Sequence, residues 1–295
     1  VALPFGTFDA TLNDPINAQV KTKLESQILS LKQFDDSKDG DGFRALIDDI
    51  KSTISSLKPP NALQSELESC FTKEKLSWPG DLETSEQGQE AWRTICAVWA
   101  SKYNERAVLS CKKAGLNHDD LNMAVLCQPV VNAKYAFVLH TVHPQTNDQT
   151  EIYGELVCGM GEALVGNFAG RALSFTVKKS DLDRPTINGF PSKSKGLFAR
   201  QNTLIFRSDS NGEDLEGFAG AGLYDSVCMN EPSLESIDYT NEPISNNEDF
   251  RNQMLSAIAK SGMEIENLLG SAQDIEGAIT EDGKLFVVQT RPQVF

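Results

Sequence analysis

The last stretch of the chain reads Asp274-Ile-Glu-Gly-Ala-Ile-Thr-Glu-Asp-Gly-Lys-Leu-Phe-Val-Val-Gln-Thr-Arg-Pro292. Its Asp282-Gly283 pair, flanked by two runs of alternating residues, is a strong signal for a β-hairpin. A two-residue type I′ turn at this pair places Glu276 opposite Gln289 and Asp274 opposite Arg291, with these side chains on one face. The other face then carries apolar residues that suit a core: Ile275, Ile279, Phe286 and Val288.

This register predicts a cation site on the hairpin. Directly opposed residues have Cβ atoms about 4.5–5.5 Å apart, so Glu276 and Gln289 could offer oxygens to one metal ion. Mg²⁺ is the expected ion, because it takes one or two carboxylates together with phosphates and water. The alternative is a hairpin whose polar face is solvated and carries one Asp274–Arg291 ion pair.

Composition places the chain among ordinary globular proteins. Its 295 residues are 40% hydrophobic and 23% charged, and Asp and Glu outnumber Lys and Arg by 42 to 27. The resulting charge of −15 argues against nucleic acid and anionic membranes as partners. No apolar run approaches the roughly 18 residues of a membrane span, and no signal peptide is visible.

The cysteines and the first residue bear on the setting of the protein. The six cysteines have no metal-like spacing, which favours reduced thiols in a cytosolic or stromal compartment. The sequence begins at Val1 without a methionine, which predicts a piece of a longer protein.

Hydrophobic periodicity predicts two regions. Helical spacing recurs from residue 1 to about 105, over residues 20–31, 43–54, 63–71 and 92–99. From about residue 121 the period is that of strands. Pro129 is expected to end the first strand, to form a bulge in it or to lie there because the strand is at a sheet edge. Residues 181–200 are expected to form a connector, and a helix around Phe250 and Ile258 precedes the hairpin. We therefore predict an α+β fold, with a mainly helical subdomain over residues 1–120 and a mixed or antiparallel sheet subdomain over residues 121–295.

Two glycine-rich segments are candidates for phosphate binding. One contains Gly159 and Gly161, and the other is the loop 207–222, with Gly212, Gly217, Gly220 and Gly222. Glycine lets backbone N–H groups approach a phosphate, and Arg207 could supply charge. Neither segment fits a Walker or dinucleotide fingerprint. Because the loop 207–222 also contains Glu213, Asp214 and Glu216, the alternative to phosphate binding is a solvated acidic turn. A catalytic histidine is not expected, because His118, His140 and His143 form no ligand set with nearby residues.

Three longer motifs stand out. They are Arg207-Ser-Asp-Ser-Asn-Gly-Glu-Asp-Leu-Glu-Gly-Phe-Ala-Gly-Ala-Gly-Leu-Tyr-Asp-Ser-Val227, Gln273-Asp-Ile-Glu-Gly277 and Val288-Gln-Thr-Arg-Pro-Gln-Val294. Together they closely resemble the C-terminal nucleotide-binding domain of plant α-glucan water dikinases. Segments 98–107, 161–166 and 170–175 extend the resemblance over nearly the whole chain. More distantly, the pattern is similar to the ATP-grasp-like domain of pyruvate phosphate dikinase and phosphoenolpyruvate synthase.

The resemblance implies an ATP-grasp-like domain of an enzyme that splits ATP into AMP, phosphate and a phosphoryl group. That group would be carried on a histidine and passed to a glucosyl unit of starch. Carried over by position, Glu276 and Gln289 would hold Mg²⁺, and Arg207 and Arg291 would contact phosphates. Gln128 and Val130 would border the adenine, and Glu162 and Asp274 would also belong to the nucleotide site.

The resemblance also implies partners and a compartment. They are ATP, α-glucan reached through the rest of the enzyme, and a mobile phosphohistidine domain of the same polypeptide. The compartment would be the plastid stroma, with the cytosol as the alternative for an extraplastidial isoform.

Three departures from the family pattern limit what this chain is expected to do. The phosphorylated histidine belongs to a separate domain, and a glycine-flanked lysine lies upstream of the segment matching Val1. Pro129 stands where the family usually has Glu, which removes one N–H while Val130 keeps its own. The chain alone should therefore bind ATP weakly and should not phosphorylate glucan. The alternatives are the ATP-binding domain of another dikinase, such as a pyruvate phosphate dikinase-like enzyme, and a non-catalytic adenylate- or glucan-binding module.

Overall fold

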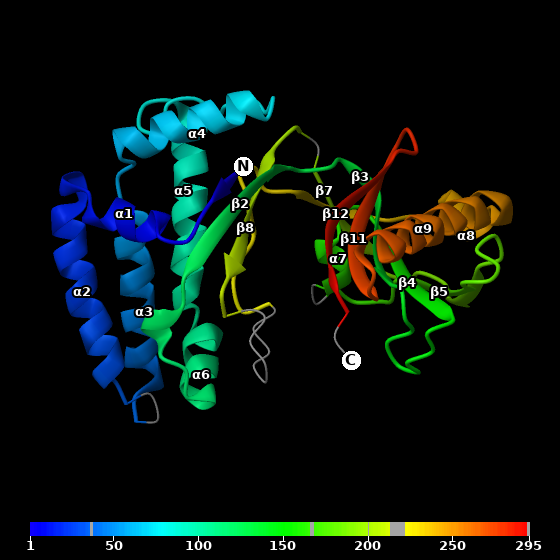
Figure 1. The fold of residues 1–295 in the computed structure, drawn as a ribbon, viewed down its shortest axis with the longest axis horizontal. Coiled ribbons are helices and arrows are strands. Elements are labelled where there is room, and N and C mark those ends of the chain that lie inside the picture. Colours follow the sequence, from blue (N-terminus) through cyan, green and yellow to red (C-terminus); the bar gives the residue numbers. More distant parts are fainter. Residues whose placement is uncertain (36–37, 166–167, 200, 213–221, 294–295) are drawn as a thin grey trace. The chain divides into compact units, whose positions relative to one another are not determined.

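Amphipathic helices dominate the first hundred residues, at the positions that the apolar spacing predicts (Figure 1). This computed structural model describes residues 1–35, 38–165, 168–199, 201–212 and 222–293. Contacts divide the chain into two units, each made of two segments. Unit 1 is Val1–Val130 with Thr203–Asn230, and unit 2 is Val131–Asn202 with Glu231–Phe295.

Unit 1 combines helices with a small antiparallel sheet of order β1-β2-β8-β9. Its helices are α1 (Thr7–Asn13), α2 (Ala18–Gln33), α3 (Gly40–Ser55), α4 (Asn61–Lys73), α5 (Glu86–Ala100) and α6 (Glu105–Ala114), with short 3₁₀ turns at Pro15–Asn17, Ser101–Tyr103 and His118–Asp120. Its strands are β1 (Ala2–Leu3), β2 (Met123–Pro129), β8 (Leu204–Ser210) and β9 (Val227–Cys228). The partition differs from the expected boundary after residue 120, because β2 pairs with β8 and both strands contact α5.

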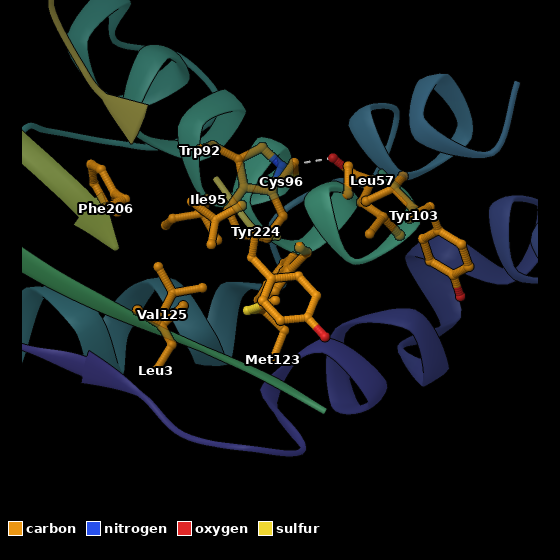
Figure 2. Packing of buried hydrophobic residues seen from close by; sticks show 14 of the residues in the cluster. Leu3, Leu57, Trp92, Ile95, Cys96, Tyr103, Met123, Val125, Phe206 and Tyr224 are labelled. Atoms are coloured by element: carbon orange, nitrogen blue, oxygen red, sulfur yellow. Dashed lines mark hydrogen bonds between the residues drawn. The ribbon is translucent and has the colours of Figure 1, made fainter. Parts of the chain in front are cut away.

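The core of unit 1 lies between α5 and one face of this sheet. Val125 and Phe206 extend from β2 and β8 toward Ile95 of α5, and all three are almost fully buried (Figure 2). The indole Nε1–H of Trp92 donates to the Leu57 carbonyl oxygen at 2.7 Å, which ties α5 to the segment after α3. The other face of the sheet carries Leu126, which is 40% exposed.

Strand β2 ends at Pro129, as the sequence predicts. The Cys127 N–H donates to the Val1 carbonyl oxygen, whereas the Val130 N–H donates to Thr203 on the β8 side. Because successive N–H groups alternate in direction, the nitrogen of Pro129 points to the β1 side of the strand. The proline therefore removes no donor from the pairing of β2 with β8.

Unit 2 is built on a six-stranded antiparallel sheet of order β12-β11-β3-β4-β5-β6. Its strands are β3 (Ala133–His140), β4 (Glu151–Cys158), β5 (Leu173–Lys178), β6 (Thr186–Gly189), β11 (Gln273–Thr280) and β12 (Leu285–Pro292). The remaining elements are α7 (Glu162–Val165), α8 (Pro243–Asn246), α9 (Glu248–Leu269) and the antiparallel pair β7 (Lys195–Phe198) and β10 (Ser233–Ser236). The connector expected over residues 181–200 thus contains β6 and β7.

The two faces of the large sheet are covered differently. Helix α9 packs on one face, where Phe137, Leu139 and Ile275 are almost fully buried with Leu255 and Ile258 of the helix. The short helix α7 covers only part of the other face, where Ala163 packs against Ala136 and Val157. No helix among the described residues is long and apolar enough to cross a membrane.

The final hairpin reaches the predicted pairing by a different route. The Thr280 N–H donates to the Lys284 carbonyl oxygen, and the Gly283 N–H donates to the Thr280 carbonyl oxygen. The loop therefore has three residues, 281–283, and Gly283 adopts a φ of +81°. A type I′ turn also needs a positive φ at Asp282, which is absent from the positive-φ residues of the described chain. The predicted two-residue turn is therefore wrong.

A β-bulge then restores the register. Gly277 lies opposite Val287 and Glu276 lies opposite Gln289, which leaves Val288 as the extra residue. Closer to the loop, pairing is displaced by one residue, so Phe286 lies opposite Ala278 and is 42% exposed. The prediction that Phe286 faces the core is wrong, whereas Ile275 and Ile279 are buried as expected.

Candidate functional site

Two adjacent rows of side chains cross the face of the large sheet opposite α9. The first row runs Tyr153, His140, Asp274 and Arg291 across β4, β3, β11 and β12. The second runs Glu155, Val138, Glu276 and Gln289 across the same strands. These eight residues share one face because directly opposed residues in an antiparallel sheet point to the same side. The four hairpin residues that the sequence predicted as a site are thus brought together.

Glu276 and Gln289 form the predicted cross-strand pair, and both side chains are partly exposed. A carboxylate and an amide oxygen are hard donors of the kind that Mg²⁺ binds. No group of three or more His, Cys, Asp or Glu side chains suited to a metal occurs among the described residues. One carboxylate and one amide oxygen suit an ion such as Mg²⁺, which takes one or two protein ligands and fills its other positions with phosphate and water.

Asp274 and Arg291 form an ion pair beside this position. The guanidinium donates from Nε at 2.9 Å and from Nη2 at 2.8 Å, and both bonds go to Oδ2 of Asp274. The Asp274 side chain is 15% exposed, whereas Arg291 is 46% exposed. Asp274 thus fixes one edge of the Arg291 guanidinium, while much of the arginine side chain stays accessible to a ligand.

The other carboxylate oxygen of Asp274 faces β3. Its Oδ1 lies 3.6 Å from Nδ1 of His140, and neither atom has a hydrogen bond within the described part of the chain. Burial lowers the pKa of His140, an effect that Arg291 and His143 reinforce and that Asp274 and Glu155 oppose. His140 is therefore a neutral ring at physiological pH.

Glu162 is the first residue of α7 and is exposed. Because Ala163 packs on Ala136 and Val157, this helix lies on the same face of the sheet as the hairpin residues. The preceding turn is held by Gly159, whose φ is +85° and whose missing Cβ would meet the Leu197 carbonyl oxygen at 2.3 Å. Only glycine fits there.

In unit 1, Gln128 and Arg207 lie on the sheet face opposite α5. Leu126 pairs with Arg207 and Gln128 pairs with Ile205, so the two predicted residues are diagonal neighbours on adjacent strands. Leu126 is 40% exposed on this face and was not predicted as a site residue. Its exposure beside polar neighbours is the feature that would have indicated it, but only after the pairing of β2 with β8 was known.

Val130 differs from the expectation in one respect. Its N–H donates to the Thr203 carbonyl oxygen at 2.9 Å, so this donor is already used within the sheet. A contact from Val130 to a purine would therefore come from its carbonyl oxygen. Of the predicted phosphate loop, Gly217, Gly220 and the acidic residues 213, 214 and 216 lie outside the described residues.

Comparison with known proteins gives a family and close relatives. Residues 73–295 match the family model described as the pyruvate phosphate dikinase AMP/ATP-binding domain. The chain is 50% identical over its whole length to an α-glucan water dikinase, chloroplastic, of Citrus reticulata, and 51% identical to α-glucan water dikinase 1, chloroplastic, of Arabidopsis thaliana. It is 25% identical, over 90% of its length, to a probable phosphoenolpyruvate synthase of Pyrococcus horikoshii. The chain spans about a fifth of the length of the two plant relatives.

Proposed function

This chain belongs to the family of pyruvate phosphate dikinase AMP/ATP-binding domains, and from that membership we propose that it is the ATP-binding domain of an α-glucan water dikinase. The observation that carries the proposal is identity of 50% along the entire chain with a named α-glucan water dikinase, twice the identity with the phosphoenolpyruvate synthase. The names of the plant relatives also favour the plastid as the compartment.

The proposed reaction begins with ATP and ends with AMP, phosphate and a phosphorylated glucosyl unit of starch. The β-phosphate of ATP would pass to a histidine in another part of the polypeptide and from there to the glucan. This chain would serve the first transfer by binding the nucleotide. Phosphoryl transfer needs mainly positioning and neutralisation of the phosphate oxygens, which fits a site built from arginine, carboxylate and amide groups.

Each candidate residue has a proposed task. Glu276 and Gln289 would hold Mg²⁺, which when bound neutralises charge on the phosphate oxygens. Arg291 and Arg207 would donate hydrogen bonds to phosphate oxygens, because a planar guanidinium matches their geometry.

The remaining residues would serve the rest of the nucleotide. Gln128, the Val130 carbonyl oxygen and the apolar side chain of Leu126 would contact adenine. Asp274 would orient Arg291, and Glu162 would lie near the nucleotide.

The test is a calorimetric titration of this chain with ATP, with and without Mg²⁺. Binding that requires Mg²⁺ is expected for the natural chain and is expected to weaken by about tenfold or more in Glu276→Gln, because a neutral amide attracts the cation less. The matched control is Glu281→Gln in the same hairpin, whose side chain is 80% exposed and pairs with Lys134. Equal binding by the two variants would rule out the metal role of Glu276.

A longer enzyme containing this chain separates the proposal from its alternatives. A dikinase releases AMP and phosphate, whereas an ATP-dependent ligase of related fold would release ADP. A non-catalytic module would bind its ligand with Glu276 and Gln289 both dispensable. Retention of glucan phosphorylation by the Glu276→Gln enzyme would contradict the proposed mechanism.

A further inference from the structure

His140 lies at the centre of the first polar row and has no role in the site described so far. It is directly opposite Asp274 on one side and Tyr153 on the other. Asp274 is in turn directly opposite Arg291, to which it gives one oxygen for two hydrogen bonds. His140 therefore reaches the exposed arginine through a single intervening carboxylate.

Two buried polar atoms in this row face each other without a hydrogen bond. Oδ1 of Asp274 and Nδ1 of His140 are both inaccessible to solvent and unpartnered among the described residues, and they lie 3.6 Å apart. A buried polar atom without a partner costs free energy, and one proton can satisfy both atoms here. A small rotation of either side chain brings Nδ1–H within bonding distance of Oδ1.

We propose that His140 is a positioning residue for nucleotide binding, which donates its Nδ1–H to Oδ1 of Asp274 and so fixes the carboxylate that holds Arg291. The inference rests on the proposed function, because it gives Arg291 the task of contacting phosphate. With Oδ1 fixed by His140 and Oδ2 fixed by Arg291, the carboxylate has one orientation. The guanidinium is then preorganised for an oxyanion, which reduces the cost of binding.

The surroundings of the ring support a single neutral tautomer. Tyr153 stacks on His140 with ring centroids 6.4 Å apart, and the Tyr153 hydroxyl is itself fixed by donating to Oε1 of Glu155 at 2.6 Å. The charged and titratable groups that face the ring are Asp274, Glu155, Arg291 and His143, and burial is the largest influence, lowering the pKa of His140. A neutral ring carries one proton, and Asp274 draws that proton to Nδ1.

The first test is the tautomer of each histidine, read from ¹⁵N chemical shifts in the natural chain. His140 is expected to be the Nδ1–H tautomer. The other two histidines serve as internal controls with the opposite tautomer. Nε2 of His118 must donate to the Lys102 carbonyl oxygen at 2.9 Å, and Nδ1 of His143 must accept from the Gln145 and Thr146 N–H groups. An Nε2–H tautomer at His140 overturns the proposal, whether or not the chain binds ATP.

The second test separates positioning from packing by two variants of similar size. Asn places an amide N–H near the position of Nδ1, so His140→Asn should bind MgATP within about twofold of the natural chain. Leu fills the space without a donor, so His140→Leu should weaken binding by about tenfold, because the carboxylate that holds Arg291 is no longer fixed and ordering the guanidinium then opposes binding. In a longer, active enzyme the loss in His140→Leu should fall on the KM for ATP more than on kcat, because binding is what Arg291 serves.

The two variants also distinguish failure of this inference from failure of the proposed function. Equal affinity for MgATP in His140→Asn and His140→Leu, with binding intact, overturns the positioning role and leaves the nucleotide site standing. Absence of MgATP binding in the natural chain counts against the proposed function of this chain alone, and the tautomer of His140 then decides the inference.

Discussion

Trp92 and Trp99 are neighbours on α5 that differ in one hydrogen bond. Their rings meet edge to face with centroids 5.7 Å apart, and both are at most 5% exposed. The Trp92 Nε1–H donates to the Leu57 carbonyl oxygen, whereas Nε1 of Trp99 is buried without a partner among the described residues. Replacing each by Phe therefore removes a similar ring area, but only Trp92→Phe leaves a buried carbonyl unsatisfied.

We expect Trp92→Phe to lower the free energy of unfolding by about 1–3 kcal/mol more than Trp99→Phe, because an orphaned buried acceptor costs that amount. Urea unfolding followed by far-UV circular dichroism measures the difference without relying on tryptophan fluorescence. Equal losses in the two variants would mean that the Leu57 carbonyl finds another donor when the indole is removed.

At the scale of elements, the final hairpin explains why the predicted pairing of Glu276 with Gln289 and of Asp274 with Arg291 accompanied a wrong turn. The alternation of residues predicts the strands and the side that Asp274 and Glu276 occupy. It does not reveal a three-residue loop or a bulge, because both leave the alternation near the site unchanged. The one-residue displacement from the loop and the one-residue bulge at Val288 cancel beyond Gly277. Between them β12 is displaced as a whole, so Phe286 faces away from the predicted core and Leu285 packs against that core instead.

The neighbours of the candidate residues that the sequence does not predict depend on distant pairing. His140 joins Asp274 only because β3 lies beside β11, and Leu126 joins Arg207 only because β2 lies beside β8. These partners are far apart in the chain, and local periodicity carries no information about which strands become neighbours. Helices α2, α3, α4 and α5 were predicted because their apolar spacing is local.

The bulge gives an element-scale prediction. Deleting Val288 places Gln289 directly after Val287, which is opposite Gly277, so Gln289 should remain opposite Glu276 in a regular ladder. Strand β12 is at the edge of the sheet, where such a change disturbs one neighbour only. Cross-strand nuclear Overhauser effects between residues 276 and 289 should persist in the deletion variant and in Val288→Ala, which keeps the bulge. Contacts from Glu276 to Thr290 instead would contradict this account of the register.

At the scale of the whole molecule, the two units have separate hydrophobic cores. One cluster is formed by residues of Val1–Val130 and Thr203–Asn230, and the two others by residues of Val131–Asn202 and Glu231–Phe295. The sequence also separates the natural reporters. All three tryptophans lie in unit 1, and Cys158 is the one cysteine of unit 2. Burial raises the pKa of this thiol to about 12, so it reacts only when unit 2 opens.

These reporters test whether a substitution that destabilises the core of one unit leaves the stability of the other unit unchanged. A Cβ at Gly277 would lie 2.1 Å from Cζ of Phe137 and 2.7 Å from the Phe286 carbonyl oxygen, so Gly277→Ala overpacks the core of unit 2. Such overpacking typically lowers the free energy of unfolding by about 1–3 kcal/mol. If the thiol reagent reports local opening, this corresponds to roughly a fivefold to hundredfold faster labelling of Cys158. Gly161→Ala, whose Cβ would meet nothing closer than 3.8 Å, is the matched control. The tryptophan-monitored midpoint should stay unchanged in both variants, because every reporter of that signal packs in the other core. A parallel shift of both signals in Gly277→Ala would mean that the chain unfolds as one cooperative body despite its separate cores.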